Sequence, residues 1–160
     1  MDETYIGGKP RKGAGGDPPK RGRGTKKVPV VGMVERGGKI KVQVKADRKI
    51  DSRSLMNLVR RGVNTKATTL MTDEYSGYLR MKQIVDHKTV NHRVWYVDGL
   101  THTNTCESFW ALLKRGIVGQ YHKVSVKHLP KYVDEFTYRY NNRKHEDIFG
   151  LTIMRGLGVA

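Results

Sequence analysis

The chain has 160 residues, a length that fits one globular domain, and 37% of them are hydrophobic, which is enough for a core. There are 31 lysines and arginines against 15 acids, a formal net charge of +16, so nucleic acid suits the chain better as a partner than an anionic membrane. The single cysteine, Cys106, excludes an internal disulfide framework and a zinc site built on paired cysteines, and weakly indicates a reducing compartment. The longest strongly apolar run, residues 28–34, is too short to span a bilayer, and no signal-peptide pattern opens the sequence. We therefore expect a cytoplasmic protein with no membrane segment.

The first 46 residues predict three strands, with a basic arm after the first. Residues 1–6 are β-prone, while residues 7–27 are rich in glycine and proline and predict a mobile loop or arm. Two β-rich segments, residues 28–35 and 39–46, flank Arg36-Gly37-Gly38, a pattern typical of a hairpin. The basic residues of the arm are Lys9, Arg11, Lys12, Lys20, Arg21, Arg23, Lys26 and Lys27.

The remainder of the chain predicts alternating helices and short strands. Asp51 or Ser52 can cap a helix that Gly62 ends, and Asp73 directly follows a short apolar strand. Pro130 is compatible with a helix only near its start. The expected elements are a helix over residues 53–61, a strand over 67–72, a short helix or turn over 75–84, a strand over 87–91, a loop over 95–102, and helices over 105–118 and 125–142. This order predicts an α/β fold with a mixed sheet flanked by helices.

Three acidic residues fall on separate predicted elements. Asp2 opens the first strand, Asp73 lies where a central strand ends, at the edge where open α/β sheets bind ligands, and Glu107 lies near the start of a helix. Carboxylates are suited to hard cations such as Mg²⁺ or Mn²⁺, and two such ions about 4 Å apart clamp both oxygens of a phosphoryl transfer. Each acid also has a structural interpretation: Asp2 as a frayed terminal residue, Asp73 as a first-turn anion, and Glu107 as the capping-box partner of Asn104.

Two further residues share the helix of Glu107. Lys114 is about two turns beyond Glu107, so both project from one face and the cation can steer a DNA phosphate; a surface salt bridge is the plainer interpretation. Trp110 is one turn from Glu107 and can stack on a base or pack in the core. The expected packing side of this helix is Phe109, Leu112, Leu113 and Gly116 or Ile117.

Several segments together carry a family resemblance. They are residues 2–9, 72–78, 102–110, 112–116, 121–125, 134–136 and 139–143, and the resemblance covers nearly the whole chain in order. The chain resembles the bacterial ISXO-type insertion-sequence transposases, and the eukaryotic Merlin-type transposases are similar. The resemblance implies an RNase H-like fold and a metal-dependent triad at Asp2, Asp73 and Glu107, accompanied by Lys114. Some members of the family are described with asparagine as the third catalytic residue, which makes Asn104 the rival of Glu107.

The resemblance also implies a reaction and its partners. We expect one catalytic domain over residues 1–160 that cleaves insertion-sequence ends and transfers the freed 3′-hydroxyl to target DNA, as a homo-oligomer on DNA in the bacterial cytoplasm and nucleoid. The basic arm, Trp110 and Arg143 are the expected DNA contacts. Such transposases usually carry an N-terminal zinc ribbon or helical region, so we expect this chain to be truncated at its N-terminus. The alternatives are an RNase H-like nuclease and an inactive remnant that only binds DNA.

Overall fold

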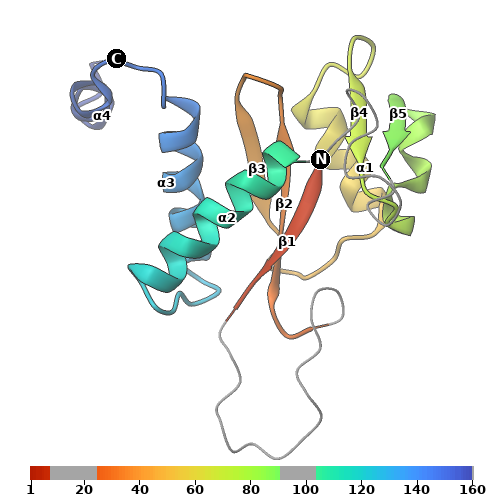
Figure 1. The fold of residues 1–160 in the computed structure, drawn as a ribbon, viewed down its shortest axis with the longest axis horizontal. Helices are drawn as coiled ribbons and strands as arrows, with labels where there is room; N and C mark the ends of the chain where they lie inside the picture. The colour runs from red at the N-terminus through yellow and green to blue at the C-terminus, as the bar shows by residue number, and fades with distance from the viewer. Residues whose placement is uncertain (8–24, 91–103, 160) are drawn as a thin grey trace, which may run out of the picture.

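The computed structural model describes residues 1–7, 25–90 and 104–159, and Figure 1 shows their arrangement. The elements are, in chain order, β1 (Asp2–Ile6), β2 (Val28–Val34), β3 (Ile40–Val44), α1 (Ser52–Gly62), β4 (Thr69–Thr72), the 3₁₀ helix η1 (Ser76–Gln83), β5 (Asp86–Thr89), α2 (Asn104–Gly119), α3 (Leu129–Asn141) and α4 (Ile148–Gly156). The prediction of a mixed α/β fold is confirmed, but the described strands form two small sheets and not the single mixed sheet that was expected.

The strands form two small sheets that meet at the N-terminus. The first is antiparallel with the order β1-β2-β3, and the second pairs β4 with β5 in parallel. The predicted hairpin joins β2 to β3 through a turn in which Gly37 has a φ of 66°, a conformation that glycine adopts without steric penalty. The amino group of Met1 donates a hydrogen bond of 2.6 Å to the carbonyl oxygen of Met71, which places the start of β1 beside β4.

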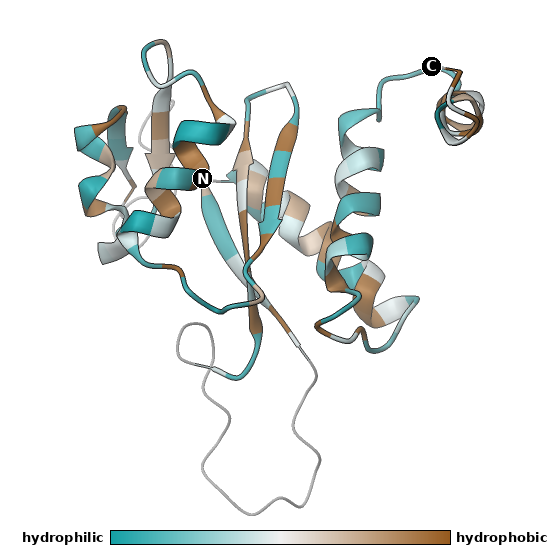
Figure 2. Cartoon of the chain, turned by 180° about the vertical axis from the view of Figure 1, so that it is seen from behind, coloured by the Kyte–Doolittle hydropathy of each residue, from teal (hydrophilic) through white to brown (hydrophobic). Residues whose placement is uncertain are grey.

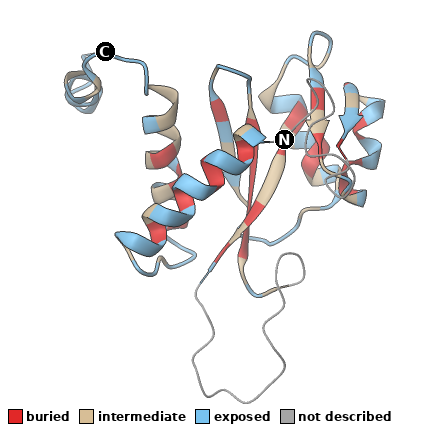
Figure 3. Ribbon diagram, viewed as in Figure 1, coloured by how far each residue is buried: buried red, intermediate tan, exposed pale blue. Residues whose placement is uncertain are grey.

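Both faces of the three-stranded sheet are covered, and β2 shows why. Six of its seven residues are buried, with side chains pointing alternately to the two faces. Val30 joins a core with α2 and α3, and Val31 joins a second core with α1 and η1. The red segments of β2 in Figure 3 lie between these layers. A continuous apolar run is therefore what this strand requires, and burial of each such side chain contributes roughly 1.5–3 kcal/mol.

Local signals set the ends of two helices. Of the two predicted caps of α1, Asp51 and not Ser52 is the N-cap, and its side chain accepts a hydrogen bond of 2.8 Å from the backbone N–H of Ser54. Pro130 lies in the first turn of α3, where a missing N–H removes no helical hydrogen bond. Leu55, Met56 and Val59 form the buried side of α1.

Other expectations need correction or stay untested. α3 begins at Leu129, not at residue 125, and β5 covers Asp86–Thr89 in place of residues 87–91. α4 was not expected from the sequence. None of its residues is buried, although the cartoon in Figure 2 is hydrophobic over much of this helix. α4 contacts α3 through Tyr138, whose hydroxyl shares a hydrogen bond of 2.9 Å with the Thr152 hydroxyl and whose ring lies 5.5 Å from the Arg155 guanidinium. The predicted loop over residues 95–102 and arm residues 8–24 lie outside the described residues.

Candidate active site

Two of the three predicted acids come together where β1 begins and β4 ends. Carboxylate oxygens of Asp2, Glu3 and Asp73 lie within 4.8 Å of one another. The hydrogen bond between the Met1 amino group and the Met71 carbonyl explains this approach, since it fixes the start of β1 beside the end of β4. Among the described residues, this is the one group of three side chains placed to hold a metal ion.

The carboxylate of Asp2 is held by two donors. The indole Nε1 of Trp110 donates to Oδ2 at 3.0 Å, and the backbone N–H of Glu3 donates to Oδ1 at 2.8 Å. The Trp110 side chain is only 4% exposed, and it reaches Asp2 across Gly32, the residue paired with Asp2 on β2. Helix α2 is thereby tied directly to the start of β1.

The environment of Asp2 disfavours its ionised form. Burial, followed by the negative charge of Glu3, raises the pKa of Asp2 to about 6, although the hydrogen bond from the Glu3 backbone lowers it in part. Asp73 adds a smaller upward contribution to the pKa. A carboxylate that is buried beside other acids is a group that a cation would stabilise in its charged form.

Glu3 and Tyr78 are parts of this site that sequence reasoning missed. The Tyr78 hydroxyl donates to Oε2 of Glu3 at 2.5 Å, and the Tyr78 side chain is 1% exposed. Burial and the nearby Glu3 charge raise the pKa of Tyr78 well above its usual value, so it remains a hydrogen-bond donor. The sequence offered one signal for Glu3, its position next to Asp2. That signal did not predict a shared site, because neighbouring side chains of a strand normally point to opposite faces of the sheet.

Asp73 has a structural role beside its place in the cluster. Its Oδ1 accepts a hydrogen bond of 3.1 Å from the backbone N–H of Tyr75, just ahead of η1. This contact agrees with the interpretation of Asp73 as an anion at a helix start. The same contact is compatible with metal binding by Asp73, because a carboxylate has two oxygens and several lone pairs.

The remaining predicted residues of α2 lie outside the cluster. Glu107, Asn104 and Lys114 are exposed, and Glu107 is not among the acids grouped with Asp2. Glu107 precedes Trp110 by one helical turn, and Lys114 follows Trp110 by one turn, so all three follow one stripe of α2. Of these three residues Trp110 alone is buried and contacts Asp2, whereas Glu107 and Lys114 lie at the exposed border of the buried side of α2.

DNA binding by the predicted contact residues stays a prediction. Trp110 is buried and its indole donates to Asp2, which agrees with core packing, the alternative interpretation of this residue. Arg143 is exposed, stacks over the Tyr140 ring at 4.1 Å, and donates to the Gly38 and Tyr140 carbonyl oxygens. Lys26 and Lys27 are described next to β2, Lys26 being exposed. Lys9, Arg11, Lys12, Lys20, Arg21 and Arg23 lie outside the described residues.

Gly32→Ala is expected to destabilise the fold through Trp110. A Cβ at position 32 would lie 2.7 Å from the indole ring, which is buried and held by its hydrogen bond to Asp2. Overpacking of this kind costs about 1–3 kcal/mol, measurable as a lower Tm. Gly119→Ala is the control, since a Cβ there meets nothing within 4 Å. Equal Tm values for both variants would show that Trp110 is not held over Gly32.

The donor set fits a divalent metal ion. Asp2, Glu3 and Asp73 offer only oxygen ligands, which Mg²⁺ and Mn²⁺ prefer. Burial and, after it, the charge of Glu3 raise the pKa of Asp2, and a bound cation would favour its ionised form. Within the described residues, no helix combines the length and apolar character needed to cross a membrane.

Comparison with known families identifies the chain. A family model described as the ISXO2-like transposase domain matches residues 1–141, which is most of the 160-residue sequence. No curated protein and no solved structure matches the chain. The match covers β1 to α3 and so includes the acidic cluster and the helix packed against it. The chain therefore belongs to the family of ISXO2-like transposase domains.

Proposed function

We propose that this chain is a DDE-type transposase catalytic domain that cleaves phosphodiesters at insertion-sequence ends and joins the freed 3′-hydroxyl to target DNA. The family match supports a transposase that acts on DNA. The observation that carries the catalytic part is the approach of Asp2 to Asp73, two acids from separate strands. Such an approach is what hydrolytic and transfer chemistry on a phosphate requires.

An RNase H-like fold is part of the proposal. The two small sheets would form one mixed sheet with the order β3-β2-β1-β4-β5 if β1 and β4 are neighbours. The hydrogen bond from the Met1 amino group to the Met71 carbonyl supports that neighbourhood. Helices on both faces of the antiparallel part are consistent with the same architecture.

Divalent metal, Mg²⁺ or Mn²⁺, would be held by Asp2 and Asp73, with Glu107 completing a two-metal site. When bound, the metal would supply charge neutralisation for the attacking and leaving oxygens of the phosphoryl transfer. Glu3 is an additional candidate ligand because its carboxylate lies in the same group. Glu107 would need to approach the cluster along the stripe of α2 that already contacts Asp2.

The protein's own residues would prepare this site in three ways. Trp110 fixes one oxygen of Asp2 and excludes water from that side, since the indole is buried. Tyr78 fixes the Glu3 carboxylate by donating a hydrogen bond. Lys114, exposed on the same stripe as Glu107, would hold a phosphate oxygen of the DNA.

The basic arm is expected to contribute phosphate contacts without sequence specificity. Deleting residues 8–24 should flatten the dependence of log affinity for duplex DNA on log salt, because each lost phosphate contact reduces the slope by about 0.9. The deletion can be closed by a short linker, since an ideal Cβ on Gly7 would lie 3.3 Å from Lys27 Cα. Fluorescence anisotropy at several KCl concentrations measures the slope. An unchanged slope would show that the arm does not contact phosphates.

A binding-only remnant is the second candidate, and one observation favours it. Glu107 is exposed and lies outside the carboxylate group that contains Asp2 and Asp73. Strand transfer with pre-cut transposon ends and a supercoiled target distinguishes the two functions. Joined products support the transposase, cleavage without joining indicates a nuclease, and DNA binding without either product indicates the remnant.

A further inference from the structure

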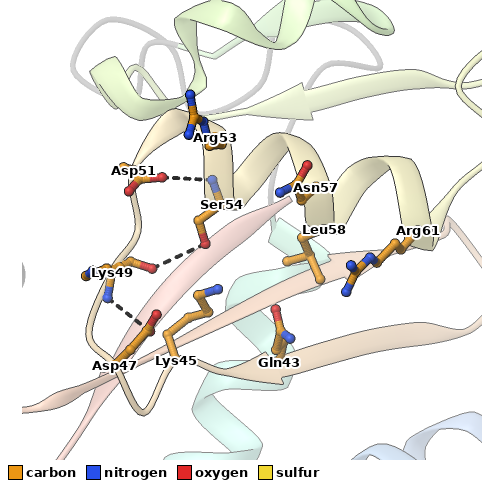
Figure 4. A pocket seen from close by; sticks show the side chains of 10 residues that line it. All are labelled: Gln43, Lys45, Asp47, Lys49, Asp51, Arg53, Ser54, Asn57, Leu58 and Arg61. Atoms are coloured by element: carbon orange, nitrogen blue, oxygen red, sulfur yellow. Dashed lines mark hydrogen bonds between the residues drawn. The ribbon is translucent and has the colours of Figure 1, made fainter.

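A hollow lined by basic side chains lies between α1 and the edge strand β3 (Figure 4). Its volume is about 310 Å³. Gln43 and Lys45 reach it from β3 and the residue after it, whereas Arg53, Asn57 and Arg61 reach it from α1. The hollow shares no lining residue with the acidic cluster.

The sequence pattern of β3 produces this hollow. Ile40, on one face, is buried in the core with α2 and α3, so Gln43 and Lys45 project to the other face. There α1 packs against Val31 of the central strand and leaves the polar side of the edge strand uncovered. On α1, the polar lining residues Arg53, Asn57 and Arg61 recur at every fourth position, which places them along one stripe.

Cations outnumber acids around the hollow. Four lining side chains are cationic and two are acidic, Asp47 and Asp51, so the lining carries a net charge of +2. The two acids accept backbone N–H bonds from Lys49 and Ser54 and form no ion pair with a described residue. The cationic side chains make no ion pair or hydrogen bond with any described residue; they are Lys45, Lys49, Arg53 and Arg61. The hollow therefore has positive charge available for an external anion.

We propose that this hollow binds the phosphate backbone of double-stranded DNA, at a site separate from Asp2, Glu3 and Asp73. The proposal rests on the proposed function, since it takes DNA as the partner. By the helical rise, Arg53 and Arg61 are separated by about 12 Å along the α1 axis. Successive phosphates of one strand rise about 3.4 Å along the duplex axis, so with α1 parallel to that axis the two arginines are roughly three or four phosphate steps apart.

The chemistry of the lining favours DNA over a lipid surface. Guanidinium groups bind phosphate oxygens in a bidentate manner, and the Gln43 and Asn57 amides can donate to phosphate or sugar oxygens. Leu58 is the one apolar side chain among the lining residues, and it is packed against the core that α1 shares with β2, so it is not available to insert among acyl chains. A concave basic surface without an apolar anchor matches a duplex backbone.

The hollow is connected to the acidic cluster through Tyr75. The Tyr75 hydroxyl donates to the carbonyl oxygen of Ile50 at 3.2 Å, and Ile50 lies between Lys49 and Asp51 of the hollow. The backbone N–H of Tyr75 donates to Asp73. A duplex held in the hollow would thus be fixed relative to Asp73, as required for a segment that flanks the reacting phosphodiester or contains the target.

The test compares two variants that lose the same charge. The hollow variant carries Lys45→Gln, Lys49→Gln, Arg53→Gln and Arg61→Gln; the control variant carries Lys66→Gln, Arg80→Gln, Lys82→Gln and Lys88→Gln, all exposed residues outside the hollow. Affinity for a random-sequence duplex is measured by anisotropy across KCl concentrations. The hollow variant should lose about 2–3 units of the log–log slope, and the control less than about 1 unit.

Each outcome has a separate meaning. Equal slope losses in the two variants overturn the proposal, whereas a wild-type chain that does not bind duplex DNA overturns the proposed function itself. Lost binding to anionic phospholipid vesicles, with duplex affinity equal to that of the control, would make the hollow a lipid site and overturn the proposal too. If circular dichroism shows that the hollow variant does not fold, the same comparison is made with two double variants. The hollow is then represented by Arg53→Gln with Arg61→Gln, and the control by Arg80→Gln with Lys82→Gln.

Discussion

Asp73→Asn is expected to lower strand transfer by at least about a thousandfold, on the order of 4 kcal/mol of activation free energy. The amide cannot supply the negative charge that holds a divalent cation. Its oxygen can still accept the hydrogen bond that Asp73 receives from the Tyr75 backbone, so the turn before η1 should persist. DNA affinity and Tm are therefore expected to stay close to those of the wild-type chain.

The matched control for this substitution is Asp86→Asn on the neighbouring strand. Asp86 also accepts a local hydrogen bond, from the Thr69 hydroxyl at 2.7 Å, but it lies outside the acidic cluster. Strand transfer is measured with pre-cut ends in Mg²⁺ and in Mn²⁺. Full activity of Asp73→Asn in either metal would refute the metal mechanism proposed here.

The same assay decides which residue of α2 completes the triad. Glu107→Gln is expected to abolish strand transfer as Asp73→Asn does, whereas Asn104→Ala should cost only about 1 kcal/mol of stability as a lost helix cap. Lys114→Ala should reduce activity less than either acid substitution, because a phosphate contact is weaker than a metal ligand. The reverse order for Glu107 and Asn104 would assign the third role to Asn104.

Local features of the fold were predictable because their causes are local. The turn at Gly37, the cap at Asp51 and the position of Pro130 each depend on backbone groups within a few residues. The β-rich composition of residues 28–35 predicted the strand β2, but its burial on both faces was not predicted. These signals placed most of the helices and strands but could not place them relative to one another.

The packing of α2 shows where periodicity is insufficient. The sequence predicted Leu112 on the packing side, but its side chain is 42% exposed, while Cys106 and Trp110 are buried. A helical pattern indicates that an apolar stripe exists, and it leaves the centre of that stripe uncertain by one residue. The actual centre is fixed by Gly32, which allows the Trp110 ring to lie on β2.

The candidate site was predictable only in part. The family resemblance pointed to Asp2 and Asp73, and the structure brings their carboxylates together. The Tyr78 to Glu3 hydrogen bond joins residues 75 positions apart, a contact that no spacing rule within one element can reveal. Glu107 as third ligand stays a prediction, as do all the catalytic roles.

The stability of the chain is expected to fall as the pH rises from about 4 to about 6, in the range where Asp2 ionises. Burial and the Glu3 charge raise the pKa of Asp2 from 3.8 to about 6 in the folded protein. A raised folded-state pKa stabilises the fold fully below the unfolded value and loses that contribution as the pH rises through the folded value. The difference of about two pKa units corresponds to roughly 3 kcal/mol as an upper estimate.

Asp2→Asn should remove this dependence, so its stability relative to the wild-type chain should rise by about 2–3 kcal/mol between pH 4 and pH 7. The change with pH is the informative quantity, because the amide also loses one of the two hydrogen bonds that Asp2 accepts from Trp110 and Glu3. Urea denaturation at each pH measures it, with Asp134→Asn, an exposed acid on α3, as the control. Manganese at pH 7.5 should stabilise the wild-type chain, by about 1.4 kcal/mol at ten times the dissociation constant, and should not stabilise Asp2→Asn. A pH-independent difference between the two proteins would show that Asp2 titrates as an ordinary exposed carboxylate, and would remove the electrostatic argument for a cation at this cluster.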